Sequence, residues 1–186
     1  MTTAALVLAA GGGSRFSGAQ HKLLSPYRGR PLVASVLGAA AGCGLDACAV
    51  VAGAVELVGL VPAGMVELFN PAWESGLASS LQVGLDWCRA EGHDAVVIGL
   101  GDMPGVPASA WAAVAESNAE VAVASFDGEL RPPVRLGRSV WDETPRSGDA
   151  GARSLWHRPG TVEVPCEGDP ADVDTTEDLD RLSDAQ

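Results

Sequence analysis

A glycine-rich segment with two cations downstream is the first part of the chain whose residue types suit anion binding. Residues 8–15 read Leu-Ala-Ala-Gly-Gly-Gly-Ser-Arg, and Lys22 follows. Backbone N–H groups in a glycine-rich turn form a concave array of partial positive charge that binds phosphate. Arg15 and Lys22 add full charges that can hold a triphosphate. We therefore predict a triphosphate site here, with an ordinary tight turn as the alternative.

Two familiar phosphate loops do not fit this segment. The Walker A pattern requires a lysine after its second glycine, but Ala19 follows Gly18. The dinucleotide fingerprint requires a third glycine where Phe16 stands. The segment therefore disfavours a nicotinamide-dependent oxidoreductase.

Two acidic segments supply candidate metal ligands. Gly101-Asp102-Met103-Pro104 follows an apolar run, and the carboxyl ends of strands form the ligand crevice of open α/β sheets. Residues 172–178 carry further carboxylates, including Asp174. Because Mg²⁺ favours one or two carboxylates plus substrate phosphates, we predict a metal site at Asp102, which a second carboxylate from residues 172–178 would complete. A turn cap at Asp102 and a solvated helix cap at residues 172–178 are the alternatives.

Serine hydroxyls mark a fourth candidate segment. Residues 70–80 begin Asn-Pro-Ala-Trp and end with Ser79 and Ser80, in the first turns of a helix that we expect to begin at Gly76. Hydroxyls and free N–H groups at the start of a helix suit the polar edge of a nucleobase. A loop followed by ordinary helix serines is the alternative.

The apolar pattern predicts the elements that position these segments. Strands are expected over residues 4–10, 47–52, 66–69, 94–100, 120–126 and 161–166, and helices over 31–43, 76–89, 107–116 and 148–156, with a helix start at 174–177. Residues 128–138, rich in arginine and proline, receive no regular element. Alternating strands and helices predict an α/β fold with a mostly parallel sheet covered on both faces. We expect one domain over residues 1–186.

Composition narrows the class of protein further. The formal net charge of -12 disfavours nucleic-acid and anionic-membrane partners. No run approaches the length of a membrane helix, and the amino terminus lacks a basic signal-peptide region, so we expect a cytoplasmic protein. The four cysteines form no zinc pattern and are interpreted as structural.

Taken together and in this order, the four segments resemble the MobA-like nucleotidyltransferases, most closely the molybdenum cofactor cytidylyltransferase branch. Residues 148–153 read Gly-Asp-Ala-Gly-Ala-Arg, similar to a further segment of that family. The resemblance implies a Rossmann-like three-layer sandwich of the nucleotide-diphospho-sugar transferase type. It also implies a nucleotide-binding amino-terminal half and an acceptor-binding carboxyl-terminal half.

The resemblance assigns roles to particular residues. It implies Mg²⁺ held by Asp102 and Asp174, with Arg15 and Lys22 on the phosphates. The nucleotide-binding residues that it implies are Ala9, Ala10, Gly11, Gly12, Gly13, Ser14, Ser79, Ser80 and Gly101. The acceptor-binding residues that it implies are Arg135, Asp149 and Arg153, and Arg131 is a further candidate for holding an anionic acceptor.

The reaction that the resemblance implies is transfer of CMP from CTP to molybdopterin or molybdenum cofactor, with release of pyrophosphate. CTP is favoured over GTP because family members with Ala-Ala-Gly in the loop tend to use CTP. Another phosphorylated acceptor, or a non-catalytic accessory role beside a partner molybdoenzyme, is the alternative. The chain departs from the family pattern in two places. The loop between Arg15 and Lys22 is longer than usual, and His21 within it is expected to be only a loop residue. Residues 131–135 match the family's segment only loosely.

Overall fold

One seven-stranded sheet forms the centre of the molecule in the computed structural model, which describes residues 1–184. The strand order is β5-β4-β1-β6-β8-β7-β9. The strands are β1 (Thr3–Ala9), β4 (Ala47–Ala52), β5 (Val66–Phe69), β6 (Ala95–Leu100), β7 (Val121–Phe126), β8 (Glu129–Gly137) and β9 (Val162–Pro165). Only β8 runs against its neighbours, so the sheet is mostly parallel, as predicted.

Helices cover both faces of this sheet, which makes the fold an α/β sandwich. The helices are α1 (Leu32–Ala41), α2 (Leu77–Ala90), α3 (Ala108–Ala115) and α4 (Thr176–Asp184). Short 3₁₀ helices lie at Lys22–Leu24 (η1), Trp73–Ser75 (η2), Arg138–Glu143 (η3) and Gly151–Leu155 (η4), and Pro26–Tyr27 (β2) pairs with Arg30–Pro31 (β3). None of the helices within residues 1–184 has the length and apolarity needed to cross a membrane.

The two faces of the sheet are filled by alternate side chains of the same strands, since successive strand residues point to opposite faces. Ala5, Val7 and Ala9 of β1 pack in the core that contains α1 and α3. Leu6 and Leu8 pack in the other core, with α2. Every residue of β1 is buried, because strands pair with it on both sides and both of its faces are covered.

The strand β8 differs from the sequence prediction, which left residues 128–138 irregular. Prolines cannot donate hydrogen bonds to a sheet, so Pro132 and Pro133 argued against a strand. In the structure the two prolines lie where the register between β7 and β8 shifts. Val123 of β7 pairs with Val134, whereas Ala124 pairs with Arg131, so Pro132 and Pro133 have no pairing partner on β7. A bulge therefore accommodates the two prolines within the longest strand of the sheet.

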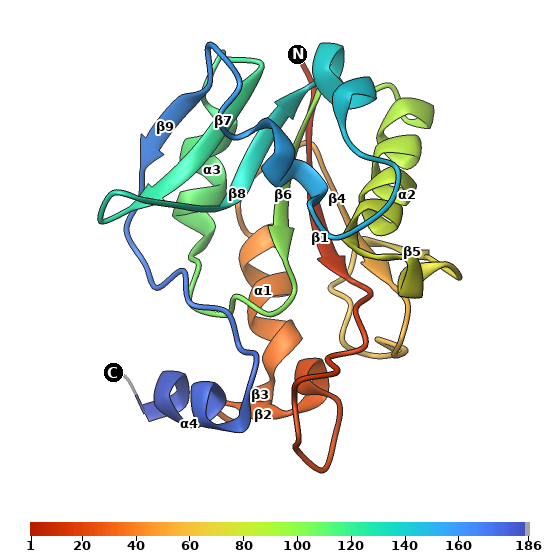
Figure 1. Cartoon of the computed structure of the whole chain (residues 1–186), viewed down its shortest axis with the longest axis vertical. Coiled ribbons are helices and arrows are strands. Elements are labelled where there is room, and N and C mark those ends of the chain that lie inside the picture. The colour runs from red at the N-terminus through yellow and green to blue at the C-terminus, as the bar shows by residue number, and fades with distance from the viewer. Residues whose placement is uncertain (185–186) are drawn as a thin grey trace.

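The parallel strands all deliver their carboxyl ends to one edge of the sheet. Figure 1 shows β1 and β6 pointing towards this edge, with the glycine-rich segment, the β2–β3 hairpin and α4 gathered beyond it. The predicted site segments after β1 and β6 therefore begin at the same edge, and the segment before α4 approaches them.

Candidate functional site

Three segments meet at the carboxyl edge of the sheet through backbone hydrogen bonds. The Gly101 N–H donates to the Leu8 carbonyl at 2.9 Å, which places the end of β6 beside the end of β1. The Val173 N–H donates to the Asp102 carbonyl at 2.9 Å. Residues 172–174 are therefore fixed against the turn that follows β6.

Four of the predicted catalytic side chains form one charged cluster at this junction. Lys22 Nζ lies 2.6 Å from Asp102 Oδ2 and 3.6 Å from Asp174 Oδ1. Arg15 Nη1 lies 2.8 Å from Asp174 Oδ2. The structure thus brings together two cations and two carboxylates from three distant parts of the sequence.

The geometry around Asp102 suits a divalent cation. Its Oδ1 atom is buried and has no hydrogen-bond partner within residues 1–184. A buried carboxylate oxygen without a partner carries an uncompensated desolvation cost that a cation would offset. The described part of the chain holds no cluster of three or more potential protein ligands, so an ion here would take its remaining ligands from water and phosphate, as Mg²⁺ does.

The imidazole of His21 connects the start of the glycine-rich loop with the residues that follow the loop. Its Nε2 lies 3.0 Å from the Gly11 carbonyl, and its Nδ1 accepts a hydrogen bond from the Leu23 N–H at 3.3 Å. These partners define a neutral imidazole that donates through Nε2. Burial lowers the pKa of His21 below its usual value, and nearby Lys22 acts in the same direction. The sequence prediction gave His21 no such role.

A small pocket lies between this loop and the start of α2. It has a volume of about 250 Å³, and we call it the loop pocket. Its lining residues are Gly11, Gly12, Trp73, Glu74, Gly76, Leu77, Ser80 and Asp149. A Cβ on Gly12 would lie 2.8 Å from Trp73 Cζ3, so glycine is what allows the loop to approach the indole.

The predicted serines lie beside this pocket in a hydrogen-bonded group. Asn70 Nδ2 donates to the Ser79 and Ser80 hydroxyl oxygens, both at 2.9 Å. Ser79 Oγ in turn donates to the Gly76 carbonyl at 2.8 Å, with the Ala72 carbonyl at 3.1 Å, and Ser80 lines the pocket. The side chains that begin α2 are therefore held in place by Asn70.

The N–H groups at the start of α2 are not free, and the expectation that they were free is wrong. The Leu77 N–H donates to Asp149 Oδ1 at 3.3 Å, and the Ala78 N–H donates to the Gly148 carbonyl at 2.9 Å. A segment far along the chain satisfies these groups, and sequence position alone could not reveal that contact.

The remaining predicted nucleotide residues lie close to the loop. Ala9 and Ala10 are buried at the end of β1, and a Cβ on Gly101 would lie 2.8 Å from Ala9 Cβ. Ala10 also accepts the Ala54 N–H at its carbonyl. Ser14 is exposed beside Arg15.

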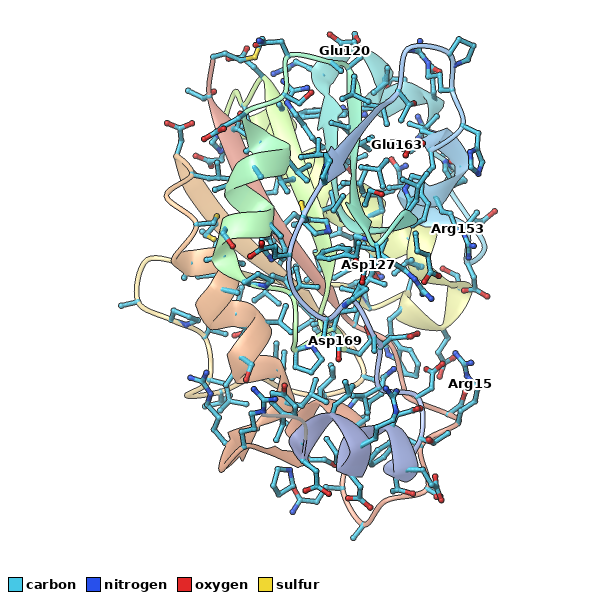
Figure 2. All side chains as sticks on the ribbon, turned by 90° about the vertical axis from the view of Figure 1, so that its left-hand side faces the viewer. Arg15, Glu120, Asp127, Arg153, Glu163 and Asp169 are labelled. Atoms are coloured by element: carbon cyan, nitrogen blue, oxygen red, sulfur yellow. The ribbon has the colours of Figure 1, made fainter. Side chains whose placement is uncertain are left out.

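A second, larger pocket of about 490 Å³ adjoins the first, and we call it the side pocket. Apolar side chains of β1, β6 and β8 form part of its lining, together with Trp156. The cations that line it are Arg15, Arg131 and Arg153. Figure 2 shows Arg15 and Arg153 on the same side of the molecule. Arg153 lies over the Trp156 ring at 5.5 Å, whereas Arg131 pairs with Glu129 at 2.8 Å.

Arg135 is the one predicted acceptor residue that the structure does not bring to either pocket. It is buried on the other face of β8, where its guanidinium donates to the Ala119 carbonyl and to Met1 Sδ. Its charge faces Glu120, which Figure 2 shows at the opposite end of the molecule from Arg15. Strand alternation explains the difference, since Val134 faces the side pocket and Arg135 faces away.

Two tryptophans contribute to the pockets without having been assigned a role from the sequence. Trp73 lines the loop pocket and Trp156 lines the side pocket. Trp156 is 8% exposed, and its Nε1 has no partner among the described residues. Trp73 belongs to the segment that the sequence singled out, and Trp156 follows three residues after Arg153, which was predicted to bind the acceptor.

Comparison with known proteins places the chain among nucleotide-handling domains. The model of the MobA-like NTP transferase domain matches residues 5–163. The bifunctional protein GlmU of Agrobacterium fabrum is 30% identical over 145 residues, and that of Roseobacter denitrificans is 32% identical over 152 residues. These matches cover 72% and 76% of this chain but only 30% and 32% of the relatives, so the chain spans about a third of their length.

Solved structures resemble the fold along almost its whole length. The Rv0371c homologue of Mycobacterium sp. strain JC1 has a TM-score of 0.81 at 30% identity, covering 97% of this chain and 94% of its own. Rv0371c of Mycobacterium tuberculosis in complex with manganese has a TM-score of 0.78 at 26% identity, with both chains covered in full. A nucleotidyl transferase of Methanothermobacter, 23% identical with a TM-score of 0.81, shares the fold, covering 98% of this chain and 96% of its own.

Proposed function

Because this chain belongs to the MobA-like NTP transferase domain family, we propose that it transfers CMP from CTP to a small phosphorylated acceptor and releases pyrophosphate. Molybdopterin or molybdenum cofactor is the acceptor that we propose. The alternative within the same chemistry is a guanylyl- or cytidylyltransferase that acts on a sugar phosphate or another small phosphate ester.

The observation that carries this proposal is the cluster of Lys22, Arg15, Asp102 and Asp174 at the end of β1 and β6. Cations alone would suit any anion, and carboxylates alone would suit any cation. A metal–triphosphate complex has both kinds of group, so it can pair with the cations through its phosphates and with the carboxylates through its metal.

Each residue of the cluster has a role in this chemistry. Arg15 and Lys22 hold the phosphates and compensate their charge while the acceptor phosphate attacks the α-phosphorus from the side opposite the departing pyrophosphate. Asp102 and Asp174 would hold the divalent cation. Mg²⁺, when bound, supplies charge neutralisation at the reacting phosphate oxygens. The complex of Rv0371c with manganese supports a divalent cation, and Mg²⁺ is our proposal for this chain.

The two pockets suit the two substrates. The loop pocket, beside the glycine-rich segment and Ser80, is assigned to the nucleoside. The side pocket is assigned to the acceptor, because it pairs an apolar wall with Arg15 and Arg153. Arg131 also lines it but is paired with Glu129, and the carboxylates of Asp149 and Asp172 complete the polar lining. Asp149 lines both pockets, and Arg135 is left out of this assignment because its guanidinium lies elsewhere.

We place the protein in the cytoplasm, where nucleoside triphosphates are available, with a molybdoenzyme as the partner that receives the modified cofactor. The acidic surface supports a small-molecule substrate over a nucleic acid, since the net charge is -12.

The test is a transfer assay with the purified protein, Mg²⁺ and α-³²P-labelled CTP or GTP. Each nucleotide is offered with molybdopterin, with a sugar phosphate and with no acceptor, and labelled product and pyrophosphate are measured. The proposal expects Mg²⁺-dependent product from CTP and molybdopterin. If only GTP, or only the sugar phosphate, gives product, the alternative reaction replaces the proposed one. An absence of product in every combination would favour an accessory role.

A further inference from the structure

The segment Gly148–Gly151 is joined tightly to the amino end of α2. The Gly148 N–H donates to the Ser75 carbonyl at 3.2 Å, and the Gly148 carbonyl accepts the Ala78 N–H at 2.9 Å. Asp149 Oδ1 accepts the Leu77 N–H at 3.3 Å. The later segment therefore caps the helix that begins beside the loop pocket.

We call the contact between Gly148–Gly151 and the amino end of α2 the joint, and it leaves no room for a side chain at Gly76 or Gly151. Gly76 has a φ of 106°, and a Cβ there would lie 2.6 Å from the Gly148 carbonyl oxygen and 2.8 Å from Asp149 Oδ1. A Cβ on Gly151 would lie 2.9 Å from Leu77 Cδ2. Because the two segments are in contact and joined by three hydrogen bonds, we expect a displacement of the start of α2 to displace Asp149 as well.

The same joint separates the two pockets. Leu77 and Asp149 are the two residues that line both of them. Asp149 alone contributes a side-chain hydrogen bond across the joint, because Leu77 takes part through its backbone N–H. Beyond Asp149, the side-pocket wall continues through Ala150 and Ala152 to Trp156.

From this arrangement we propose that Asp149 is a positioning residue that couples the two substrate pockets. Nucleotide in the loop pocket shifts the amino end of α2, and the carboxylate of Asp149 transmits the shift to the wall of the side pocket. The inference rests on the proposed function only in placing nucleotide in the loop pocket. Coupling between two ligands is reciprocal, so an acceptor in the side pocket changes the affinity for nucleotide by the same factor as nucleotide changes the affinity for acceptor.

The test uses tryptophans as reporters of each pocket, and it needs no acceptor. The full chain is labelled with 5-fluorotryptophan, and the ¹⁹F resonances of Trp73 and Trp156 are assigned with the variants W73F and W156F. CTP with Mg²⁺ is then titrated into the wild-type protein, D149A and D149N. The exposed Glu163 on β9, labelled in Figure 2, supplies the control variant E163A.

In the wild-type protein and E163A, saturating CTP is expected to shift both resonances. In D149A the Trp73 resonance still shifts, at a higher CTP concentration, but the Trp156 resonance shifts less than in the wild type, because only the backbone contacts of Gly148 remain to carry the movement. D149N is expected to restore the Trp156 shift, because an asparagine Oδ1 still accepts the Leu77 N–H. Restoration by D149N separates positioning through this oxygen from the charge of Asp149.

Three results would overturn the coupling while leaving the proposed function intact. The first is a Trp156 resonance that shifts as much in D149A as in the wild type. The second is a wild-type protein in which CTP shifts the Trp73 resonance but not the Trp156 resonance. The third is a D149N variant that behaves like D149A. A Trp73 resonance that no nucleotide moves would instead contradict the proposed function, and the coupling with it.

Discussion

Lys22 is the only lysine of the chain, and its ammonium lies between the two carboxylates of the candidate site. The side chain is mostly buried, so it reaches Asp102 rather than solvent. Residue types and their places after apolar runs singled out Arg15, Lys22 and Asp102, the family resemblance added Asp174, and the structure brings these four side chains together. Sequence could not place Arg135, whose side of the strand depends on the register of β8.

Asp102 should be essential for binding a divalent cation together with nucleotide. The variant D102N replaces one of two anionic ligands with a neutral amide, so Mn²⁺ affinity in the presence of CTP should fall at least about tenfold, which is about 1.4 kcal/mol. The loss of free Mn²⁺ signal in electron paramagnetic resonance measures this affinity. D169N, at an exposed aspartate whose carboxylate caps the Ala171 N–H, is the control and should bind like the wild type. Equal Mn²⁺ binding by D102N would remove Asp102 from the metal site.

His21 should make stability depend on pH. Burial lowers its pKa in the folded state below 6.5, so between the folded and unfolded values the unfolded chain binds more protons. Stability should therefore rise with pH through this window: the contribution is present above about pH 6.5 and is lost as pH falls through the folded pKa. Urea unfolding between pH 5 and pH 7.5 measures the slope.

The variant H21Q should flatten this slope, because glutamine does not titrate. H157Q changes an exposed histidine and should retain the wild-type slope. A slope that H21Q leaves unchanged would mean that the imidazole does not close the loop as a neutral group.

At the scale of elements, the amino end of α2 depends on a close approach that only glycine permits. Gly76 combines a positive φ with contacts to Gly148 and Asp149, whereas Gly44 has a φ of 77° and open space around it. G44A should cost about 1 kcal/mol for backbone conformation alone. G76A should cost about 1–3 kcal/mol more, because overpacking forces the joint apart.

Urea unfolding of G76A and G44A measures the difference, and CTP binding should weaken in G76A only. Equal destabilisation by the two variants would mean that the joint yields without cost, which would weaken the case for a rigid wall between the pockets.

Sequence patterns predicted some elements better than others, for physical reasons. The apolar runs of β1, β4 and β6 were recognised because strands buried on both faces are continuously apolar. The strand β8 was missed, because a bulge that accommodates Pro132 and Pro133 depends on the pairing with β7. The cap of α2 by Gly148 and Asp149 was missed for the same kind of reason, since it joins segments that are far apart in the chain.

At the scale of the whole molecule, a protein with a net charge of -12 carries its candidate anion site at one edge of the sheet. Lys22 and Arg15 are the cations of this site, and Asp102 and Asp174 pair with them. We therefore expect nucleotide binding there to depend on a divalent cation, because the two carboxylates would otherwise repel the phosphates.

Thermal unfolding with nucleotides tests this central claim most directly. CTP, GTP, ATP and UTP are added in turn at a fixed concentration, each with and without Mg²⁺, since a ligand of the native state raises Tm by mass action. We expect the largest shift with CTP and Mg²⁺, about 5–10 °C at a hundredfold excess over Kd, and a much smaller shift without the metal. A Tm that no nucleotide raises, with or without Mg²⁺, would contradict it.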